Sequence, residues 1–349
     1  PSGDKRILVT HQPIGVSLLI TPWNFPAGMA TRKIGPAVAA GCTMILKPAG
    51  ETPLTALAIV DILERCGLPK GVLNVILPAK TGPAIAKILH DSRVKNLSFT
   101  GSTQVGKILL KEAADQVIRC SMELGGNAPF VVLDDANIEE AVKGLMMAKM
   151  RNGGAACTAA NRIYVASSIG EKFIAEFAKA MAALKMGVGR EAGIQLGASV
   201  SMKERNKIAE LVDASKARGA KVHLGGTTPD GAGAFYPATV LEVKKDDAIL
   251  AEEVFGPVAP VVLFDTDEEA LKLANDTEYG LISYVYSEDL KRAIRFAEGL
   301  EAGMVGINRG LLSDPAAPFG GVKQSGLGRE GGFDGVHEFL QTKYIGVEI

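Results

Sequence analysis

Hydrophobic residues along the chain follow two patterns that alternate at short intervals. Short apolar runs, such as 129–133 and 258–264, are typical of buried strands, whereas apolar residues spaced three and four apart over 53–63 indicate a helix. The pattern predicts strands at 6–10, 15–20, 42–46, 72–77, 94–100, 129–133, 162–165, 221–224, 237–241, 258–264, 283–287, 304–308 and 342–349. It predicts helices at 53–66, 82–90, 137–150, 170–184, 201–218, 267–274 and 288–299.

Strands and helices alternate at the spacing of right-handed βαβ units, which predicts an α/β protein with a Rossmann-type parallel sheet. Such sheets bind nucleotides at the carboxyl ends of their strands. Thr52 is expected to cap the helix that starts at Pro53. At 349 residues the chain is too long for one ordinary core, so we expect two domains.

Composition narrows the classes of function. The net charge of −1 gives no electrostatic reason to expect a nucleic-acid or membrane partner. The longest nearly apolar run, at 34–46, is interrupted by Gly, Pro and Thr and is too short to span a bilayer. The four cysteines show no metal-like spacing, and two of them fall in strand-like runs, which favours a reduced, cytoplasmic protein.

The stretch 147–162 carries the strongest candidate for chemistry. A predicted helix enters it, a predicted strand leaves it, and small residues between them allow a tight turn around Cys157. A thiol on such a turn is placed to act as a nucleophile. A cysteine in an arbitrary protein is more often a small buried hydrophobe, so other segments must supply what a thiolate needs.

Three further segments carry polar groups near strand ends. Asn24 lies in a loop fixed by two flanking prolines. The turn Gly101–Lys107, between a strand and a helix, is a candidate phosphate-binding site. Its sequence is similar to the P-loop motif G-x-x-x-x-G-K. Ile108 stands where a P-loop needs Ser or Thr for magnesium, which argues against an NTPase. Glu123 precedes a glycine pair in apolar surroundings, where a raised pKa would suit a general base.

Five motifs stand in one order over nearly the whole chain. They are Pro-Trp-Asn-Phe-Pro at 22–26, Phe-Thr-Gly-Ser-Thr-x-x-Gly at 99–106, Glu-Leu-Gly-Gly at 123–126, the Cys157 turn, and Glu-Glu-x-Phe-Gly-Pro at 252–257. Together they resemble the aldehyde dehydrogenase superfamily. The segments 31–33 and 323–326 resemble its succinate-semialdehyde branch. The resemblance implies a Rossmann-type cofactor domain, an α/β catalytic domain and a small oligomerisation region.

The resemblance also implies a role for each motif. Cys157 would attack the aldehyde carbon as a thiolate, and the Asn24 amide and the Cys157 backbone N–H would hold the developing oxyanion. Hydride transfer to a nicotinamide would leave a thioester, which Glu123 would hydrolyse by activating water. The cofactor contacts implied are Trp23, Lys47, Gly50, Gly101, Ser102, Gly106, Leu124, Glu253 and Phe255.

Cofactor preference depends on the segment 47–50. Relatives that prefer NAD commonly carry Glu at the position of Gly50, where it binds the adenosine ribose hydroxyls. Gly50 leaves room for a 2′-phosphate, and Lys47 is placed to pair with it. We therefore expect NADP, with NAD as the alternative if Glu51 turns inward.

Three residues match the carboxylate-binding positions of the succinate-semialdehyde branch: Arg32, Arg151 and Ser313. Two arginines aimed at one pocket fit an anionic aldehyde, because an unpaired buried charge is costly. The resemblance thus implies oxidation of succinate semialdehyde to succinate, as in 4-aminobutyrate breakdown. The alternatives are another aldehyde such as glutarate semialdehyde, an acylating enzyme, or an inactive variant, because Ala155 stands where relatives usually carry Gln or Glu.

The resemblance divides the chain into four parts. Residues 1–13 would form a bridging strand, 14–126 part of the cofactor domain, 127–325 the catalytic domain, and 326–349 a return helix with an oligomerisation strand. A surface strand at the tail favours pairing with another copy, so we expect a homodimer or homotetramer. The family usually has about a hundred or more residues before the Pro-Trp-Asn-Phe-Pro loop, so the N-terminal part of the family fold is expected to be absent here.

Overall fold

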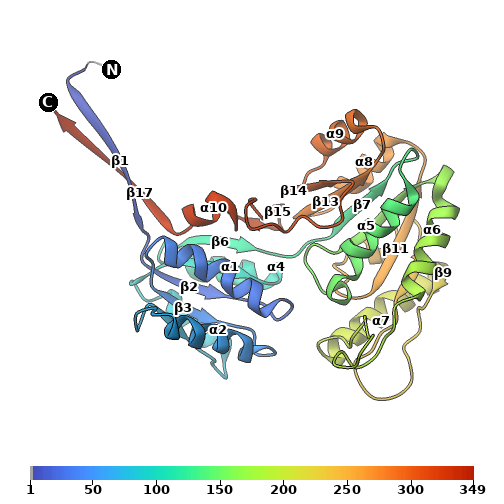
Figure 1. Cartoon of the computed structure of the whole chain (residues 1–349), viewed down its shortest axis with the longest axis horizontal. Helices are drawn as coiled ribbons and strands as arrows, with labels where there is room; N and C mark the ends of the chain where they lie inside the picture. The colour runs from blue at the N-terminus through green and yellow to red at the C-terminus, as the bar shows by residue number, and fades with distance from the viewer. Residues whose placement is uncertain (1–2) are drawn as a thin grey trace. The chain divides into compact units, whose positions relative to one another are not determined.

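The computed structural model describes residues 3–349, which divide into two compact units (Figure 1). Unit 1 comprises the chain up to Leu124 with 313–320 and 326–349, and unit 2 comprises 125–312 with 321–325. Each unit combines a mostly parallel sheet with helices, which confirms the predicted α/β class.

The sheet of unit 1 carries the loops predicted to bind the cofactor. Its strands are β2 (Val16–Ile20), β3 (Met44–Lys47), β4 (Leu73–Val75), β5 (Val94–Thr100), β6 (Arg119–Glu123) and β16 (Gly326–Leu327). Its helices are α1 (Pro26–Ala39), α2 (Pro53–Arg65), α3 (Thr81–Leu89), α4 (Thr103–Ala114) and α10 (Gly332–His337). The strand order is β16-β6-β5-β2-β3-β4, and only the pair β16–β6 is antiparallel.

Alternate residues of β2 enter two separate cores. Leu18 packs in one apolar cluster with Ile85 of α3 and Leu109 of α4, whereas Leu19 packs in another with Ile34 of α1. Helices therefore cover both faces of the sheet, which is why residues 17–20 of β2 are all buried instead of alternating between buried and exposed.

The strand order of unit 1 contains a topological switch between β2 and β5. From β2 the chain continues through β3 and β4 on one side, and it then returns to β5 and β6 on the other. Ile20 and Phe99 are paired across the two strands, so the loops that follow them start side by side. Open α/β sheets hold ligands at this point, so the topology itself marks a ligand site.

A two-stranded ribbon completes unit 1 and extends away from its sheet (Figure 1). It pairs β1 (Lys5–Pro13) with β17 (Leu340–Glu348) in antiparallel register, from Lys5 opposite Glu348 to Pro13 opposite Leu340. The side chains of Ile7, Leu8 and Val9 are 58%, 51% and 58% exposed. An isolated two-stranded ribbon is marginal in water, so its apolar surface calls for a partner.

Unit 2 is built on a second sheet of seven strands. They are β7 (Ala128–Val132), β8 (Ala160–Ala166), β9 (Lys221–Leu224), β10 (Thr239–Glu242), β11 (Val258–Phe264), β13 (Ile282–Tyr286) and β14 (Met304–Ile307). The order is β14-β13-β7-β8-β11-β10-β9, with only β9 and β10 antiparallel. The α-helices are α5 (Ile138–Met150), α6 (Ser167–Ala182), α7 (Met202–Ala217), α8 (Asp267–Asn275) and α9 (Leu290–Gly299). Shorter elements are η1 (Arg151–Gly154), η2 (Ala248–Leu250), β12 (Tyr279–Gly280) and β15 (Val322–Lys323).

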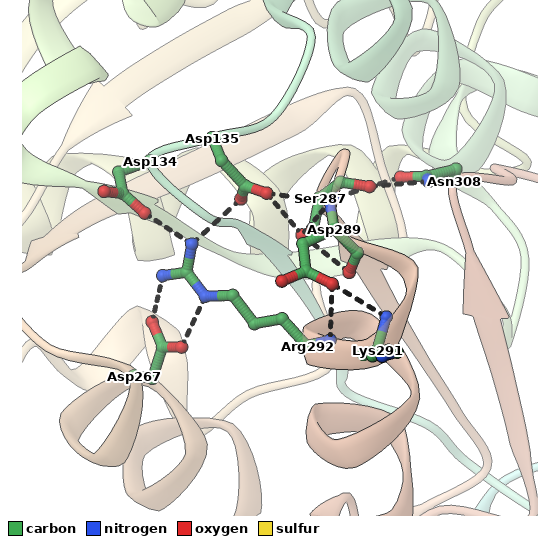
Figure 2. Close-up of polar contacts among 8 residues, drawn as sticks. All are labelled: Asp134, Asp135, Asp267, Ser287, Asp289, Lys291, Arg292 and Asn308. Atoms are coloured by element: carbon green, nitrogen blue, oxygen red, sulfur yellow. Dashed lines mark hydrogen bonds and ion pairs between the residues drawn. The ribbon is translucent and has the colours of Figure 1, made fainter.

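The carboxyl ends of β7 and β13 are tied together by one arginine. Figure 2 shows the Arg292 guanidinium between three carboxylates, at 2.6 Å from Asp267, 2.7 Å from Asp134 and 3.0 Å from Asp135. Ser287, which follows β13, donates to Asp135 at 2.8 Å. This network occupies the strand ends where a parallel sheet would offer a ligand site. Chemistry in unit 2 is therefore expected at the opposite, amino ends of its strands.

The structure confirms most predicted elements, although several begin or end at other residues than predicted. The strand predicted at 72–77 is only Leu73–Val75, and the one predicted at 42–46 begins at Met44. Thr52 precedes α2, but its side chain makes no capping hydrogen bond, and its hydroxyl oxygen is buried without a hydrogen-bond partner among residues 3–349. No helix over residues 3–349 is long and apolar enough to cross a membrane.

Candidate active site

The predicted site residues of unit 1 gather at the carboxyl edge of its sheet. Ile20, which leads to the Asn24 loop, pairs with Lys47 on one side and with Phe99 on the other. Thr100, which leads to the Gly101 turn, pairs with Glu123. Parallel register thus brings four motifs far apart in sequence to one edge. Within the Asn24 loop, Trp23 and Asn24 are half-buried, and Pro26 begins α1.

The turn between β5 and α4 has the form of a phosphate site. Ser102 caps α4 by accepting a hydrogen bond from the Val105 N–H at 3.4 Å. A Cβ on Gly106 would lie 2.5 Å from Leu124, so glycine permits the close approach of α4 to the end of β6. The first N–H groups of a helix and its dipole attract phosphate, so the start of α4 suits a cofactor pyrophosphate.

The segment 47–50 fits an additional phosphate. Lys47 ends β3 and is half-buried, and burial lowers its pKa while the Glu51 charge opposes that shift. Gly50 is exposed, and a Cβ placed on it meets no other atom of the described chain within 4 Å. A cation beside open space is the arrangement that the 2′-phosphate of NADP would require.

Glu123 is the most perturbed acid of unit 1. Its side chain is buried, and neither carboxyl oxygen has a hydrogen-bond partner among residues 3–349. Burial, reinforced by the nearby Glu330 charge, raises its pKa well above the usual range, against the opposing charges of Lys33, Arg32 and Arg329. A Cβ on Gly320 would lie 2.8 Å from Glu123 Oε1, so glycine leaves room for the carboxyl group.

Two residues beside Glu123 were not assigned a role from the sequence. Lys33 Nζ lies 2.6 Å from Glu330 Oε1 and donates to Ser98 Oγ at 2.9 Å. Lys33 is 1% exposed, although it lies on a helix whose other buried residues are apolar or small. A lysine within a buried helical stripe was the available signal. Its partner, 297 residues further along, could not be read from the pattern.

Arg32 and Ser313 are brought together as the resemblance implied. Arg32 Nη2 donates to Ser313 Oγ at 2.8 Å, and the guanidinium lies 4.3 Å from the centre of the Phe319 ring. Its Nε is 3.8 Å from Glu330, a long ion pair. The remaining nitrogen, Nη1, is buried without a hydrogen-bond partner in the part of the chain that the structure describes. The Arg32 guanidinium is thus held in place while its Nη1 has no hydrogen-bond partner among the described residues.

In unit 2, Cys157 lies half-buried between η1 and β8. Asn152 and Gly153 adopt positive φ angles of 53° and 61°, which turn the chain sharply after α5. Arg151 Nη2 donates to Thr158 Oγ1 at 3.4 Å across this turn. The predicted tight turn around Cys157 is therefore confirmed, and it lies at the amino end of β8.

Glycines bring two other motifs against the cysteine turn. A Cβ on Gly126 would lie 2.3 Å from the Cys157 carbonyl oxygen, and one on Gly154 would lie 2.1 Å from the Gly256 carbonyl oxygen. The Gly126 N–H also donates to Glu253 Oε1 at 3.2 Å. Glu253 is half-buried, and the loss of solvent around its carboxyl group raises its pKa to about 7. Only residues without a side chain allow these three backbone segments to meet so closely.

Behind this turn lies a further lysine that sequence reasoning missed. Lys149, on the last turn of α5, is 0% exposed. Its Nζ donates to Asn161 Oδ1 at 2.8 Å and to the Val254 carbonyl oxygen at 3.3 Å. Burial lowers its pKa to about 7, although the Glu253 charge opposes that shift.

The geometry defines a two-unit α/β enzyme with a nucleotide-type sheet in one unit and a cysteine turn in the other. The sequence profile of the aldehyde dehydrogenase family matches residues 1–345. The chain therefore belongs to this family and is an oxidoreductase of the aldehyde dehydrogenase type.

Individual relatives are similar over nearly the whole chain. A succinate-semialdehyde dehydrogenase of Paenarthrobacter nicotinovorans is 54% identical, over 99% of this chain and 77% of the relative. A glutarate-semialdehyde dehydrogenase of Pseudomonas putida is 48% identical, over 99% of this chain and 72% of the relative. A crystal structure of an NADP-dependent enzyme of E. coli has a TM-score of 0.98 and 44% identity, covering 100% of this chain and 72% of the other.

Proposed function

We propose that the protein oxidises succinate semialdehyde to succinate, with NADP as the electron acceptor. The observation that carries this proposal is Arg32, whose guanidinium is oriented by Ser313 and Phe319 while Nη1 stays buried without a partner. A buried donor on a charged group costs free energy unless a ligand satisfies it. The far carboxylate of a semialdehyde would do so. The names of the two relatives, which both denote semialdehyde dehydrogenases, support an anionic aldehyde.

Cys157 is proposed as the nucleophile. Its thiolate would attack the aldehyde carbon, forming the carbon–sulfur bond while the aldehyde oxygen becomes an oxyanion. The Asn24 side-chain amide and the Cys157 backbone N–H would donate to that oxyanion, a stabilisation of about 3 kcal/mol for each donor in comparable enzymes. Arg151 would join Arg32 and Ser313 in holding the substrate carboxylate.

Glu123 is proposed as the base that releases the product. It would take a proton from water as the water oxygen attacks the thioester carbon, and the Cys157 thiolate would then leave. Burial beside Glu330 raises the pKa of Glu123, so its carboxylate is a stronger base than an exposed one. The neighbouring charges of Lys33, Arg32 and Arg329 oppose that rise in the pKa.

The residues at the carboxyl edge fit a nicotinamide dinucleotide, which accepts the hydride when bound. The start of α4, with Gly101, Ser102 and Gly106, would hold the pyrophosphate. Lys47 and the open space at Gly50 would hold a 2′-phosphate. The remaining proposed contacts are Trp23, Leu124, Glu253 and Phe255. Glu253 would accept hydrogen bonds from the nicotinamide ribose hydroxyls, and Phe255 would lie beside the nicotinamide ring.

Gly50→Glu tests the cofactor assignment. The space beside Gly50 accommodates the larger side chain, and its carboxylate would repel a 2′-phosphate and accept from ribose hydroxyls. We expect the ratio of kcat/KM for NADP to that for NAD to fall by about tenfold or more. An unchanged ratio would place the adenosine ribose elsewhere.

Arg32→Ala tests the substrate class, with butanal as a four-carbon aldehyde that lacks the carboxylate. We expect kcat/KM for succinate semialdehyde to fall by about 10- to 100-fold, because hydrogen bonds to charged groups contribute about 1.5–3 kcal/mol. The value for butanal should fall much less, because butanal has no carboxylate and feels only the effect of the Arg32 charge on the Glu123 pKa, and both values should stay unchanged in the exposed control Arg65→Ala. An equal loss for both aldehydes would show that Arg32 only supports the fold. Glutarate semialdehyde, one methylene longer, tests the chain length of the preferred substrate.

A second copy of the chain is the proposed partner. The β1–β17 ribbon exposes apolar side chains on an unsupported pair of strands, and a neighbouring copy would cover them.

A further inference from the structure

Lys149 joins the two chain segments that flank the cysteine turn. Lys149 lies near the end of α5, the helix before the cysteine turn. Its Nζ donates at 2.8 Å to Asn161 in β8, the strand after the cysteine turn. The bond closes a loop of 12 residues around Cys157. Asn161 is 1% exposed, and its amide nitrogen has no hydrogen-bond partner within residues 3–349. Among residues 3–349, the hydrogen bond of the Asn161 side chain is thus made by its oxygen and not by its amide nitrogen.

The same ammonium group reaches the segment proposed to contact the cofactor. Nζ donates at 3.3 Å to the carbonyl oxygen of Val254, which stands between Glu253 and Phe255. Both acceptors of Lys149 are neutral, so its charge is balanced through space by Glu253. The groups that face Glu253 are Lys149 from α5, Lys207 from α7 and the Gly126 N–H. The charges of Lys149 and Glu253 each favour the ionised form of the other, and Lys207 lowers the pKa of Glu253 in the same direction and by more than Lys149 does.

We propose that Lys149 is a positioning residue that fixes the Cys157 turn against the 252–257 loop and keeps Glu253 as a carboxylate able to accept from the cofactor. The part concerning Glu253 rests on the proposed cofactor function. The part concerning the turn rests only on the contacts of Lys149. One side chain would thus set the geometry of the nucleophile and the charge of a cofactor contact together.

Two substitutions separate these effects. Lys149→Met keeps the apolar stem and removes both the hydrogen bonds and the charge. Asn161→Ala keeps the charge and removes one acceptor, and it also serves if Lys149→Met does not fold. Lys143→Met is the matched control, because Lys143 lies on the same helix but is exposed and pairs with Glu139.

The first readout is hydrogen–deuterium exchange of the amides at 151–160. Loss of a hydrogen bond from a charged donor should speed exchange there by about tenfold or more in Lys149→Met and in Asn161→Ala. Exchange at 94–106, in unit 1, and throughout the Lys143→Met control should be unchanged. Native exchange rates at 151–160 in Lys149→Met or, failing its folding, in Asn161→Ala would overturn the positioning role.

The second readout is the pH dependence of NADPH binding, followed by quenching of Trp23, the single tryptophan. Burial raises the pKa of Glu253 to about 7, and loss of the Lys149 charge should raise it further. The pH midpoint at which binding strengthens should therefore move upward in Lys149→Met and stay in place in Asn161→Ala. Weakening by the same factor at every pH would overturn the charge role, since a merely structural defect acts in that way. If the native chain bound neither NADPH nor NADH, the proposed function would fail, and exchange at 151–160 would still decide whether Lys149 fixes the turn.

Discussion

Lys33→Met removes the ammonium group that lies 2.6 Å from Glu330 in the interior of unit 1. The two side chains are 1% and 5% exposed, so the carboxylate that remains cannot turn to water. It would also stay close to Glu123, whose charge it opposes. Removing one partner of such a buried pair costs about 3–5 kcal/mol. That is a large share of the total stability of a domain, which is about 5–15 kcal/mol.

The double variant Lys33→Met with Glu330→Gln removes both charges of the pair. Most of the lost stability should return, because replacing both members of a buried pair is often close to neutral. Arg65→Met is the matched control. It breaks the ion pair with Asp61, in which both side chains are more than half exposed, and it should change the stability little.

Urea unfolding followed by Trp23 fluorescence measures these effects where they act, because the tryptophan lies in unit 1. A loss of about 4 kcal/mol lowers the unfolding midpoint by roughly 1.5–4 M when the slope is about 1–3 kcal/mol per molar. A loss below about 1 kcal/mol in Lys33→Met would refute the assignment of a buried, mutually dependent pair. A double variant as unstable as Lys33→Met would refute it equally.

Three further predictions follow from the site and the ribbon. Burial raises the pKa of Glu123 above its ordinary value of 4.5, so the native chain loses stability as pH rises from 4.5 toward the raised pKa. The melting temperature of Glu123→Gln should therefore equal that of the native chain at pH 4 and exceed it at pH 8. Gly154→Ala should lower the free energy of unfolding by about 2 kcal/mol or more, because φ is +81° and the new Cβ would lie 2.1 Å from a backbone oxygen. In the control Gly189→Ala the new Cβ meets no described atom within 4 Å, so urea unfolding should be nearly unchanged. Ile7→Lys combined with Val9→Lys should lower the mass measured by light scattering, because both substitutions place charges on the exposed apolar ribbon.

Each of these predictions has a clear contrary result. A Glu123→Gln chain whose melting temperature differs from the native value equally at both pH values would show that the acid is not perturbed by burial. Equal stabilities of Gly154→Ala and Gly189→Ala would contradict the close packing of the cysteine turn. A native chain that stays monomeric at every concentration would exclude the ribbon as an interface.

The sequence predicted the sheets better than it predicted the polar interior. β11 matches the expected range because a continuous apolar run between turn signals is typical of a strand covered on both faces. The carboxyl edge of unit 1 also followed from the βαβ pattern, since parallel register aligns the loops after successive strands. Lys33 and Lys149 were not predicted as buried, because a pattern of polar and apolar residues assigns lysine to the surface.

The partners of Lys33 and Lys149 explain why the sequence did not predict their burial. Glu330 lies 297 residues from Lys33, and the Val254 carbonyl lies 105 residues from Lys149. Such pairs are set by tertiary packing and leave no local periodicity. The predicted Thr52 cap is wrong, since the Thr52 side chain makes no capping hydrogen bond, and the sequence at 52–53, a good cap residue followed by proline, gave no sign of this.

The covalent mechanism is tested most directly by a single turnover of the Glu123→Gln chain with succinate semialdehyde and NADP. We expect rapid formation of about one equivalent of NADPH per chain, followed by very slow turnover, because the thioester forms but its hydrolysis lacks a base. Mass spectrometry of the quenched protein should place a succinyl group on Cys157, and Cys157→Ser should give neither signal. NADPH formation in Cys157→Ser, or continuous turnover of Glu123→Gln at the native rate, would contradict the account.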